Sequence, residues 1–280
     1  MHLGAHVSIA GGIPNAPERA AALGCEVFQI FSRSPRGGHP PALTKTVRAE
    51  FRGAMAKHRQ QGFAIHTPYY INFASTTPRI RYGSISVVRE ELERGALLGA
   101  DAVITHLGST KDAGEELGFR KCWRSIQRIL DGYTGSTTLL LEISAGAGDL
   151  LGGSFEELAS LIKQVESRAP YRNRVGVCLD TCHVFAAGYD LRTKTAVDAT
   201  LERFDRVVGL KRLQALHAND SKFGLGEHRD RHEHIGNGQI GREGFRAIVN
   251  HPKLKGLSMY LETEPEGMQS DLVTLKSLRK

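Results

Sequence analysis

The sequence predicts a single (β/α)8 barrel that spans residues 1–280. Short apolar runs, most of four to six residues, alternate eight times with longer amphipathic segments, and the chain length suits the ~250 residues typical of this fold. No segment rich in proline or glycine interrupts the alternation, so we expect one domain. An open, doubly wound sheet is the alternative that such alternation also allows.

Eight apolar runs have the length and composition of buried parallel strands. In chain order they are His2–Val7, Glu26–Phe31, Phe63–His66, Ala102–His106, Thr138–Glu142, Val175–Asp180, Leu213–His217 and Ser258–Glu262. Between them, apolar residues recur at steps of three and four, which is typical of amphipathic helices. One predicted helix spans Ser84–Leu98 and stops at Gly99, and another follows a capping box made by Ser154 and Glu157.

Composition and charge argue against a membrane-spanning protein and against a secreted, disulfide-rich one. The chain is 40% hydrophobic and 24% charged, and no apolar stretch reaches the ~18 residues of a membrane span. Its first residues lack the pattern of a secretory signal, and four cysteines are too few for a disulfide framework, so we expect a cytoplasmic protein. The formal net charge of +7 favours a polyanionic partner.

Imidazole and carboxylate side chains close six consecutive predicted strands: His66, His106, Glu142, Asp180, His217 and Glu262. In a barrel these strand ends converge on one face, where active sites of the fold lie. One such residue alone is commonly a polar strand end that water satisfies. Three carboxylates brought together repel one another, however, unless cations neutralise them. The six together therefore predict a metal site.

The segment VCLDTCHVFAAGYD, residues 177–190, holds two cysteines beside an Asp/His pair. Asp180 is expected at the barrel rim, and Cys178 lies two residues deeper on the same side of the strand. Cys182 is expected to point elsewhere as a small buried side chain. A zinc site built on the cysteines lacks further partners, so we assign the chemistry to Asp180 and His183.

The segment HANDSKFGLGEHRDRHEHIGNG, residues 217–238, supplies a second group. Asp230 and His232 are two residues apart and would share one side of an extended segment, facing His183. His228 and His234 remain alternatives to them. The nine candidates are too many for one ion and fit two or three divalent metals, with zinc favoured by nitrogen and oxygen ligands and manganese as the alternative. His6 ends the first strand, and we expect it to support the ligands.

Basic and aromatic residues occupy the loops expected on the same face. The cations are Arg33, Arg36, Arg79, Arg81, Lys222, Arg229 and Arg231. They would contact phosphates. Tyr69 and Tyr70 suit insertion into a base stack, although ordinary loop packing is the alternative for both. Together with the metal pocket, they favour nucleic acid as the substrate.

At these residues the sequence resembles the endonuclease IV family of apurinic/apyrimidinic DNA repair enzymes. The most specific matches are GVCLDTCHVFAAGYDLR (176–192) and HANDSKFGLGEHRDRHEHIGNGQIG (217–241), with HTPYYIN (66–72) and THLGS (105–109) in support. The similarity runs from GAHVSIAGG (4–12) to YLETEPEG (260–267). The resemblance therefore covers nearly the whole chain.

The resemblance implies a barrel with three zinc ions, manganese being the alternative at one site. It assigns His66, His106 and Glu142 to one zinc; Glu142, Asp180, His217 and Glu262 to the second; and His183, Asp230 and His232 to the third. The implied reaction is hydrolysis, with Glu142 as the catalytic carboxylate, of the phosphodiester 5′ to an abasic site in double-stranded DNA. The products are a 3′-hydroxyl and a 5′-deoxyribose phosphate, and 3′-blocked ends are related substrates. Arg36 and Tyr69 match positions that probe the minor groove.

The chain departs from the family pattern at three places. The loop SPRGGH (34–39) lacks the tryptophan that usually follows Asn-Pro-Arg, Ile143 replaces a common asparagine, and Asn237 stands where Lys or Glu is common. None is a proposed ligand. Two other functions stay open, a metal-dependent sugar isomerase and a DNA-binding module without catalysis. We expect a monomer that binds no membrane.

Overall fold

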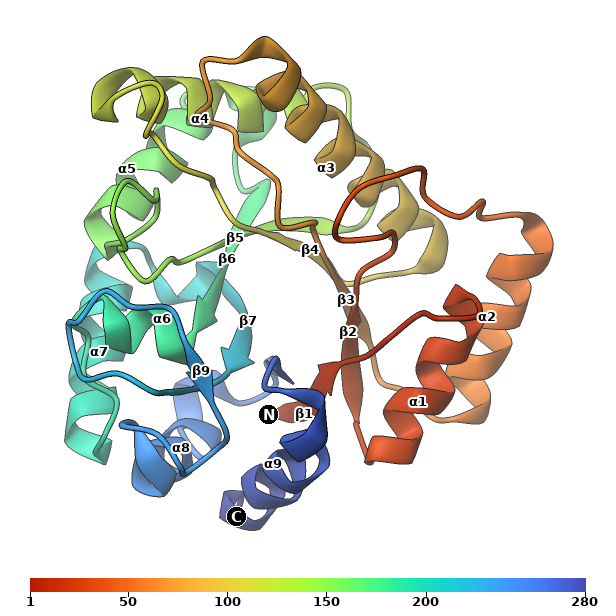
Figure 1. The fold of residues 1–280 in the computed structure, drawn as a ribbon, viewed down its shortest axis with the longest axis vertical. Helices are drawn as coiled ribbons and strands as arrows, with labels where there is room; N and C mark the ends of the chain where they lie inside the picture. Colours follow the sequence, from red (N-terminus) through yellow and green to blue (C-terminus); the bar gives the residue numbers. More distant parts are fainter.

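The computed structural model of the chain describes residues 1–280 and contains a closed barrel of eight parallel strands (Figure 1). The strands, in barrel order, are β1 (His2–His6), β10 (Ser258–Leu261), β7 (Leu213–Ala218), β6 (Val175–Asp180), β5 (Thr138–Glu142), β4 (Ala102–Thr105), β3 (Phe63–His66) and β2 (Val27–Ile30). All eight predicted strands are present, and each end lies within one residue of its predicted position. The predicted barrel is confirmed, and the open sheet is wrong.

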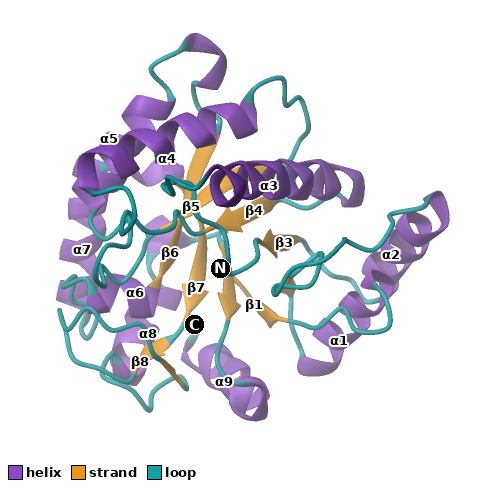
Figure 2. Cartoon of the chain, turned by 45° about the horizontal axis from the view of Figure 1, so that its top comes forward, coloured by secondary structure: helices purple, strands orange, loops and turns teal.

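The helices pack outside the barrel and cover the strands (Figures 1 and 2). They are α1 (Ala16–Leu23), α2 (Lys45–Lys57), α3 (Pro78–Leu98), α4 (Glu115–Leu130), α5 (Phe155–Val165), α6 (Thr181–Ala186), α7 (Lys194–Val207), α8 (Gly241–Val249) and α9 (Pro265–Leu278). Helix α3 begins at Pro78 rather than at the predicted Ser84, because its first turns are largely exposed and carry no apolar stripe. No helix has the length and apolar content needed to cross a membrane.

The predicted capping box at the start of α5 forms only in part. The Ser154 hydroxyl accepts a hydrogen bond from the backbone N–H of Glu157, as predicted. The Glu157 carboxylate, however, accepts from the N–H groups of Gly152 and Gly153 and does not return to Ser154. It therefore fixes the loop that leads from β5 into the helix.

The barrel interior below the strand ends is filled by a separate apolar cluster. It comprises Val27, Ala64, Ala102, Ile104, Leu140, Cys178, Ala215 and Tyr260. Three alanines leave room for the Tyr260 ring, and Gly4 is required because a Cβ there would lie 1.7 Å from the Val27 carbonyl oxygen. Cys178 occupies the predicted deep position, and burial raises the pKa of its thiol to about 11. This cluster closes the floor of the cavity above it.

A short antiparallel ribbon, which the sequence did not predict, follows β7. It pairs β8 (Asp220–Ser221) with β9 (His232–Glu233). The buried Asp220 carboxylate accepts hydrogen bonds from the N–H groups of Ser221, Gly236, Ile240 and Gly241. This ribbon carries the segment that ends in Asp230 and His232 back over the barrel mouth.

Candidate metal centre

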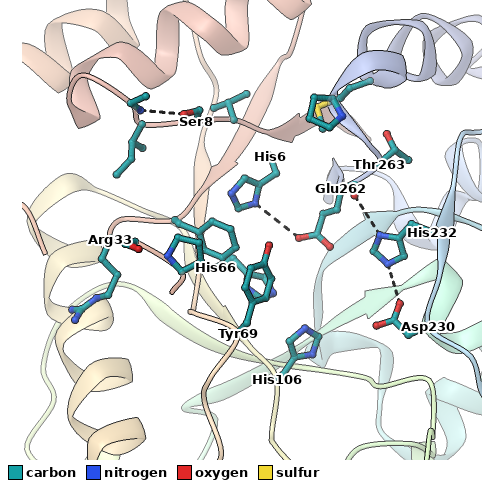
Figure 3. Close-up of a pocket in the computed structure, with 18 of the residues that line it drawn as sticks. His6, Ser8, Arg33, His66, Tyr69, His106, Asp230, His232, Glu262 and Thr263 are labelled. Atoms are coloured by element: carbon teal, nitrogen blue, oxygen red, sulfur yellow. Dashed lines mark hydrogen bonds and ion pairs between the residues drawn. The ribbon is translucent and has the colours of Figure 1, made fainter. Parts of the chain in front are cut away.

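A cavity of ≈ 790 Å³ opens at the carboxyl ends of the strands, and its lining includes His66, His106 and Glu262 from the predicted strand ends (Figure 3). Figure 3 shows His66, His106, Asp230, His232 and Glu262 around this common space, with Tyr69 drawn between His66 and His106. The close approach follows from the barrel, because parallel strands that end together place their last side chains around one axis.

Glu142 lies at the centre of the group and is buried at the end of β5. Its Oε2 is 3.0 Å from His66 Nε2 and 3.5 Å from His106 Nε2. Its Oε1 is 2.9 Å from His217 Nδ1 and 3.4 Å from His183 Nδ1. One carboxylate therefore faces imidazoles from four different segments.

A second group forms between β5, β6, β7 and β10. Oxygen or nitrogen atoms of Glu142, Asp180, His217 and Glu262 lie within 4.8 Å of one another. His217 Nδ1 is 3.3 Å from Glu262 Oε2 and 3.7 Å from Asp180 Oδ2. Three carboxylates and one imidazole in this space form a donor set that suits a divalent cation.

A third group consists of His183, Asp230 and His232, also within 4.8 Å of one another. His183 is positioned because Asp180 Oδ1 caps α6 and accepts from the His183 N–H, while His183 Nδ1 faces the Ile143 carbonyl at 2.9 Å. His232 Nε2 is buried and has no hydrogen-bond partner. An unpartnered buried imidazole nitrogen facing carboxylates is suited to bind a cation, since buried polar atoms are rarely left unpaired.

Two alternatives for this third group lie apart from it. His228 Nδ1 faces the Ala145 carbonyl, and His234 Nδ1 bonds the buried Asp271 carboxylate.

Cys182 lies closer to the third group than predicted, because its sulfur is within 4.8 Å of oxygen or nitrogen atoms of Asp180 and His232. The expectation that Cys182 points away is wrong, and α6 begins too directly after β6 for its first residues to turn aside.

The electrostatics of the pocket are dominated by carboxylates and imidazoles that face one another. Burial opposes ionisation of Glu142, yet the imidazoles of His106 and His217 hold its pKa well below the ordinary value. Burial also opposes ionisation of Glu262 and Asp230, but neighbouring histidines lower the pKa of each to about 2. All three carboxylates are therefore ionised at neutral pH, as metal ligation requires.

Gln29 is a buried member of the site that sequence reasoning missed. Its amide nitrogen donates to Glu262 Oε1 at 2.6 Å and faces His6 Nδ1 at 3.0 Å, while His217 Nε2 donates to its amide oxygen at 2.9 Å. This contact leaves His217 Nδ1 free to face the carboxylates. His6 Nδ1 lies 4.0 Å from Glu262 Oε1, and burial lowers the pKa of its imidazole to about 4.

Most of the predicted DNA-binding side chains lie next to residues that line the cavity: Tyr69 is part of the lining, Arg36 follows Pro35, and Arg229 and Arg231 flank Asp230. Arg36, Lys222, Arg229 and Arg231 are exposed, as are Tyr69 at 70% and Tyr70 at 41%. Arg229 covers the Phe223 ring at 3.5 Å. Arg33 is different, because it is buried against Glu91 and pairs with Glu90 at 2.7 Å. The prediction that Arg33 contacts phosphate is wrong; it anchors the loop that carries Arg36.

A (β/α)8 barrel that gathers six imidazoles and carboxylates at its strand ends, with His183, Asp230 and His232 beside them, fits a metal-dependent enzyme. A family model described as a xylose isomerase-like TIM barrel matches residues 17–279. The probable endonuclease 4 of Halothermothrix orenii is 38% identical over all of both chains. That of Cenarchaeum symbiosum is 39% identical over 100% of this chain and 99% of its own.

Solved structures agree with these relatives. Endonuclease IV from Thermus thermophilus superposes with a TM-score of 0.86 at 34% identity, covering 99% of this chain and 98% of that one. A D-tagatose 3-epimerase-like protein shares the fold alone, with a TM-score of 0.71 and 16% identity. The chain therefore belongs to the endonuclease IV family. The predicted DNA-cleaving enzyme is confirmed at the level of the family, and the sugar isomerase alternative is only a distant relative.

Proposed function

We propose that this chain hydrolyses the phosphodiester 5′ to abasic sites in double-stranded DNA, and also acts on 3′-blocked ends, in base excision repair. The observation that carries the proposal is the grouping of the nine predicted side chains at the carboxyl ends of the strands, where six of them line one cavity, with exposed cations and aromatic residues on neighbouring segments. A small neutral sugar would need the metal ligands but not the basic rim.

The ligand groups support three zinc ions, with manganese as the alternative at one. Two of the sets implied by the family, Glu142/Asp180/His217/Glu262 and His183/Asp230/His232, coincide with clusters of adjacent ligand atoms. In the first set, His66 and Glu142 cluster with His217, and His106 stands 3.5 Å from Glu142. Zinc bound here supplies Lewis acidity for phosphate oxygens and lowers the pKa of water.

The chain's own groups then hold the reacting atoms. Glu142, ionised and buried between the first two ligand sets, is the proposed catalytic carboxylate that orients the attacking water. Gln29 fixes the His217 ring, and Asp180 fixes His183 through the cap of α6. Pre-set side chains of this kind avoid reorganisation when charge develops on the phosphate.

The rim of the cavity is the proposed DNA surface. Lys222, Arg229 and Arg231 contact phosphates, Arg36 and Tyr69 probe the minor groove, and Tyr70 stacks against the bases beside them. An abasic nucleotide has little stacking to lose, so it enters the cavity at lower cost than an intact nucleotide. We also propose that the protein is a monomer with a single domain. Its four buried, unpaired cysteines support a location in the reducing cytoplasm.

Incision of a labelled duplex tests this function. The duplex carries one abasic analogue that cannot undergo β-elimination, and an identical undamaged duplex is the control. We expect cleavage on the 5′ side, leaving a 3′-hydroxyl that a polymerase extends. Cleavage on the 3′ side, or none with metal-loaded protein, contradicts the proposal.

A further inference from the structure

Helices α3 and α4 carry a basic and aromatic surface outside the metal centre. They pack side by side on one flank of the barrel (Figure 2). Residues 78–89 of α3 and 117–130 of α4 contain no Asp or Glu. The same two segments contain Arg79, Arg81, Arg89, Arg120, Lys121, Arg124 and Arg128. We call this surface the α3/α4 patch.

Aromatic rings are interleaved with these cations. Arg81 and Arg128, from different helices, lie over the Tyr82 ring at 4.8 and 5.1 Å from its centroid. Arg124 lies over Trp123 at 5.2 Å. Tyr82 remains 46% exposed between its two guanidiniums. Guanidiniums held on aromatic faces lose little side-chain freedom when they bind an anion.

Nearby carboxylates do not neutralise the centre of the patch. Arg120 lies 3.8 Å from Glu116, and Arg89 pairs with Glu93 at 2.7 Å, both at its margins. Arg124 and Arg128 are exposed and have no carboxylate within salt-bridge distance. An exposed arginine on a helix ordinarily faces only solvent, but a segment pair with several cations and no acid indicates a polyanionic partner.

The patch is continuous with the proposed DNA surface. The segment that carries Tyr69 and Tyr70 leads directly into α3, and the Asn72 N–H donates to the Ser84 hydroxyl at 2.9 Å. Arg81 donates to the Ser75 carbonyl at 2.7 Å in the same segment. The start of α3 therefore lies beside the segment that carries the two tyrosines of the proposed DNA surface.

We propose that the α3/α4 patch binds the sugar–phosphate backbone of the substrate duplex beyond the lesion. The inference rests on the proposed function, because the duplex must first occupy the metal centre. Contacts of this kind carry no sequence information and add affinity and orientation. A longer duplex should therefore bind more tightly than a short one, and the advantage should depend on these arginines.

Two duplexes with the same central abasic analogue test the inference, one with about one helical turn of ~10 base pairs on each side and one with about three. Affinity is measured with wild type, Arg124→Glu/Arg128→Glu and Arg124→Gln/Arg128→Gln. The matched control is Arg206→Glu/Lys211→Glu, the same charge change in exposed residues at the opposite end of the barrel.

We expect the affinity ratio of long to short duplex to fall about tenfold in the Glu pair and less in the Gln pair. The salt slope on the long duplex should fall by about 2, since each lost phosphate contact removes ~0.9. The control should keep the wild-type ratio. If the α3/α4 variants keep the wild-type ratio of long- to short-duplex affinity while the wild type incises both duplexes, the patch does not bind DNA. The proposed function is then unaffected. Wild type that incises neither duplex overturns both.

Discussion

Four imidazole nitrogens lie within 3.5 Å of the buried Glu142 carboxylate, so a single negative charge organises most of the centre. We predict that Glu142→Gln lowers the bound zinc and slows incision by at least about 1,000-fold, because several kcal/mol of charge stabilisation are lost. Elemental analysis and single-turnover incision measure the two effects. Glu266→Gln, in an exposed residue of α9, is the control. If Glu142→Gln kept the zinc content and incision rate of the wild type, the Glu142 carboxylate would not be needed for metal binding or catalysis.

Gln29 determines which nitrogen of His217 faces the carboxylates. We predict that Gln29→Leu, of similar size, weakens zinc binding by about 10- to 100-fold, as loss of a hydrogen-bond partner behind a metal ligand does. Competition with a zinc-sensitive chelating dye measures the affinity, and excess zinc should restore part of the incision rate. Unchanged zinc affinity would show that the His217 orientation does not depend on Gln29.

The sequence could predict the six strand-end residues because ionisable side chains stand out at the ends of apolar runs. It could not predict Gln29, since one amide within the run VFQIF does not show which way it faces. Nor could the sequence show that Arg33 is buried in ion pairs whereas Arg36, in the same loop, is exposed. Only the packing of α3 against the loop reveals that Glu90 and Glu91 neutralise Arg33.

At the scale of elements, the β8–β9 ribbon depends on Asp220 as the acceptor for four backbone N–H groups. We predict that Asp220→Ala lowers the free energy of unfolding by about 3 kcal/mol, because buried donors are left unpaired. Urea denaturation measures the loss. Asp149→Ala, in an exposed residue, should change stability by less than about 0.5 kcal/mol. Similar values for both variants would show that the ribbon holds without its buried acceptor.

The β8–β9 ribbon and the first turns of α3 are the elements that could not be predicted from the sequence. Strands of two residues are too short to show alternation, and the start of α3 is exposed on most sides, so neither carries a periodic pattern. The eight barrel strands were predictable because most residues of each are apolar and buried. Buried elements were therefore easier to predict from the sequence than exposed ones.

At the scale of the whole molecule, Glu26 joins the two ends of the chain. Its carboxylate accepts from both Arg279 Nη atoms, at 2.6 and 2.7 Å, and from the Leu3 N–H. The Arg279 hydrogen bond lowers the pKa of Glu26 to about 2. Because the folded-state pKa lies below the ordinary 4.5, this stabilisation is present above pH ~4.5 and is lost as the pH falls toward 2.

We predict that Glu26→Gln lowers the free energy of unfolding by about 1 kcal/mol at neutral pH, the full linkage value being reduced by solvent screening of a part-exposed pair. The difference between wild type and variant should shrink as the pH falls below 4.5. Urea denaturation across this pH range checks the sign. A difference that grows in acid would show that the Glu26 charge does not stabilise the fold.

The nine grouped side chains are proposed to bind catalytic metal. The most direct test removes metal with a chelator, titrates zinc back, and follows bound zinc and incision of the abasic duplex in the same samples. We expect no incision after chelation and full recovery as zinc binding approaches three equivalents per chain. Incision that survives complete metal removal, or zinc that binds without restoring it, would contradict the assignment.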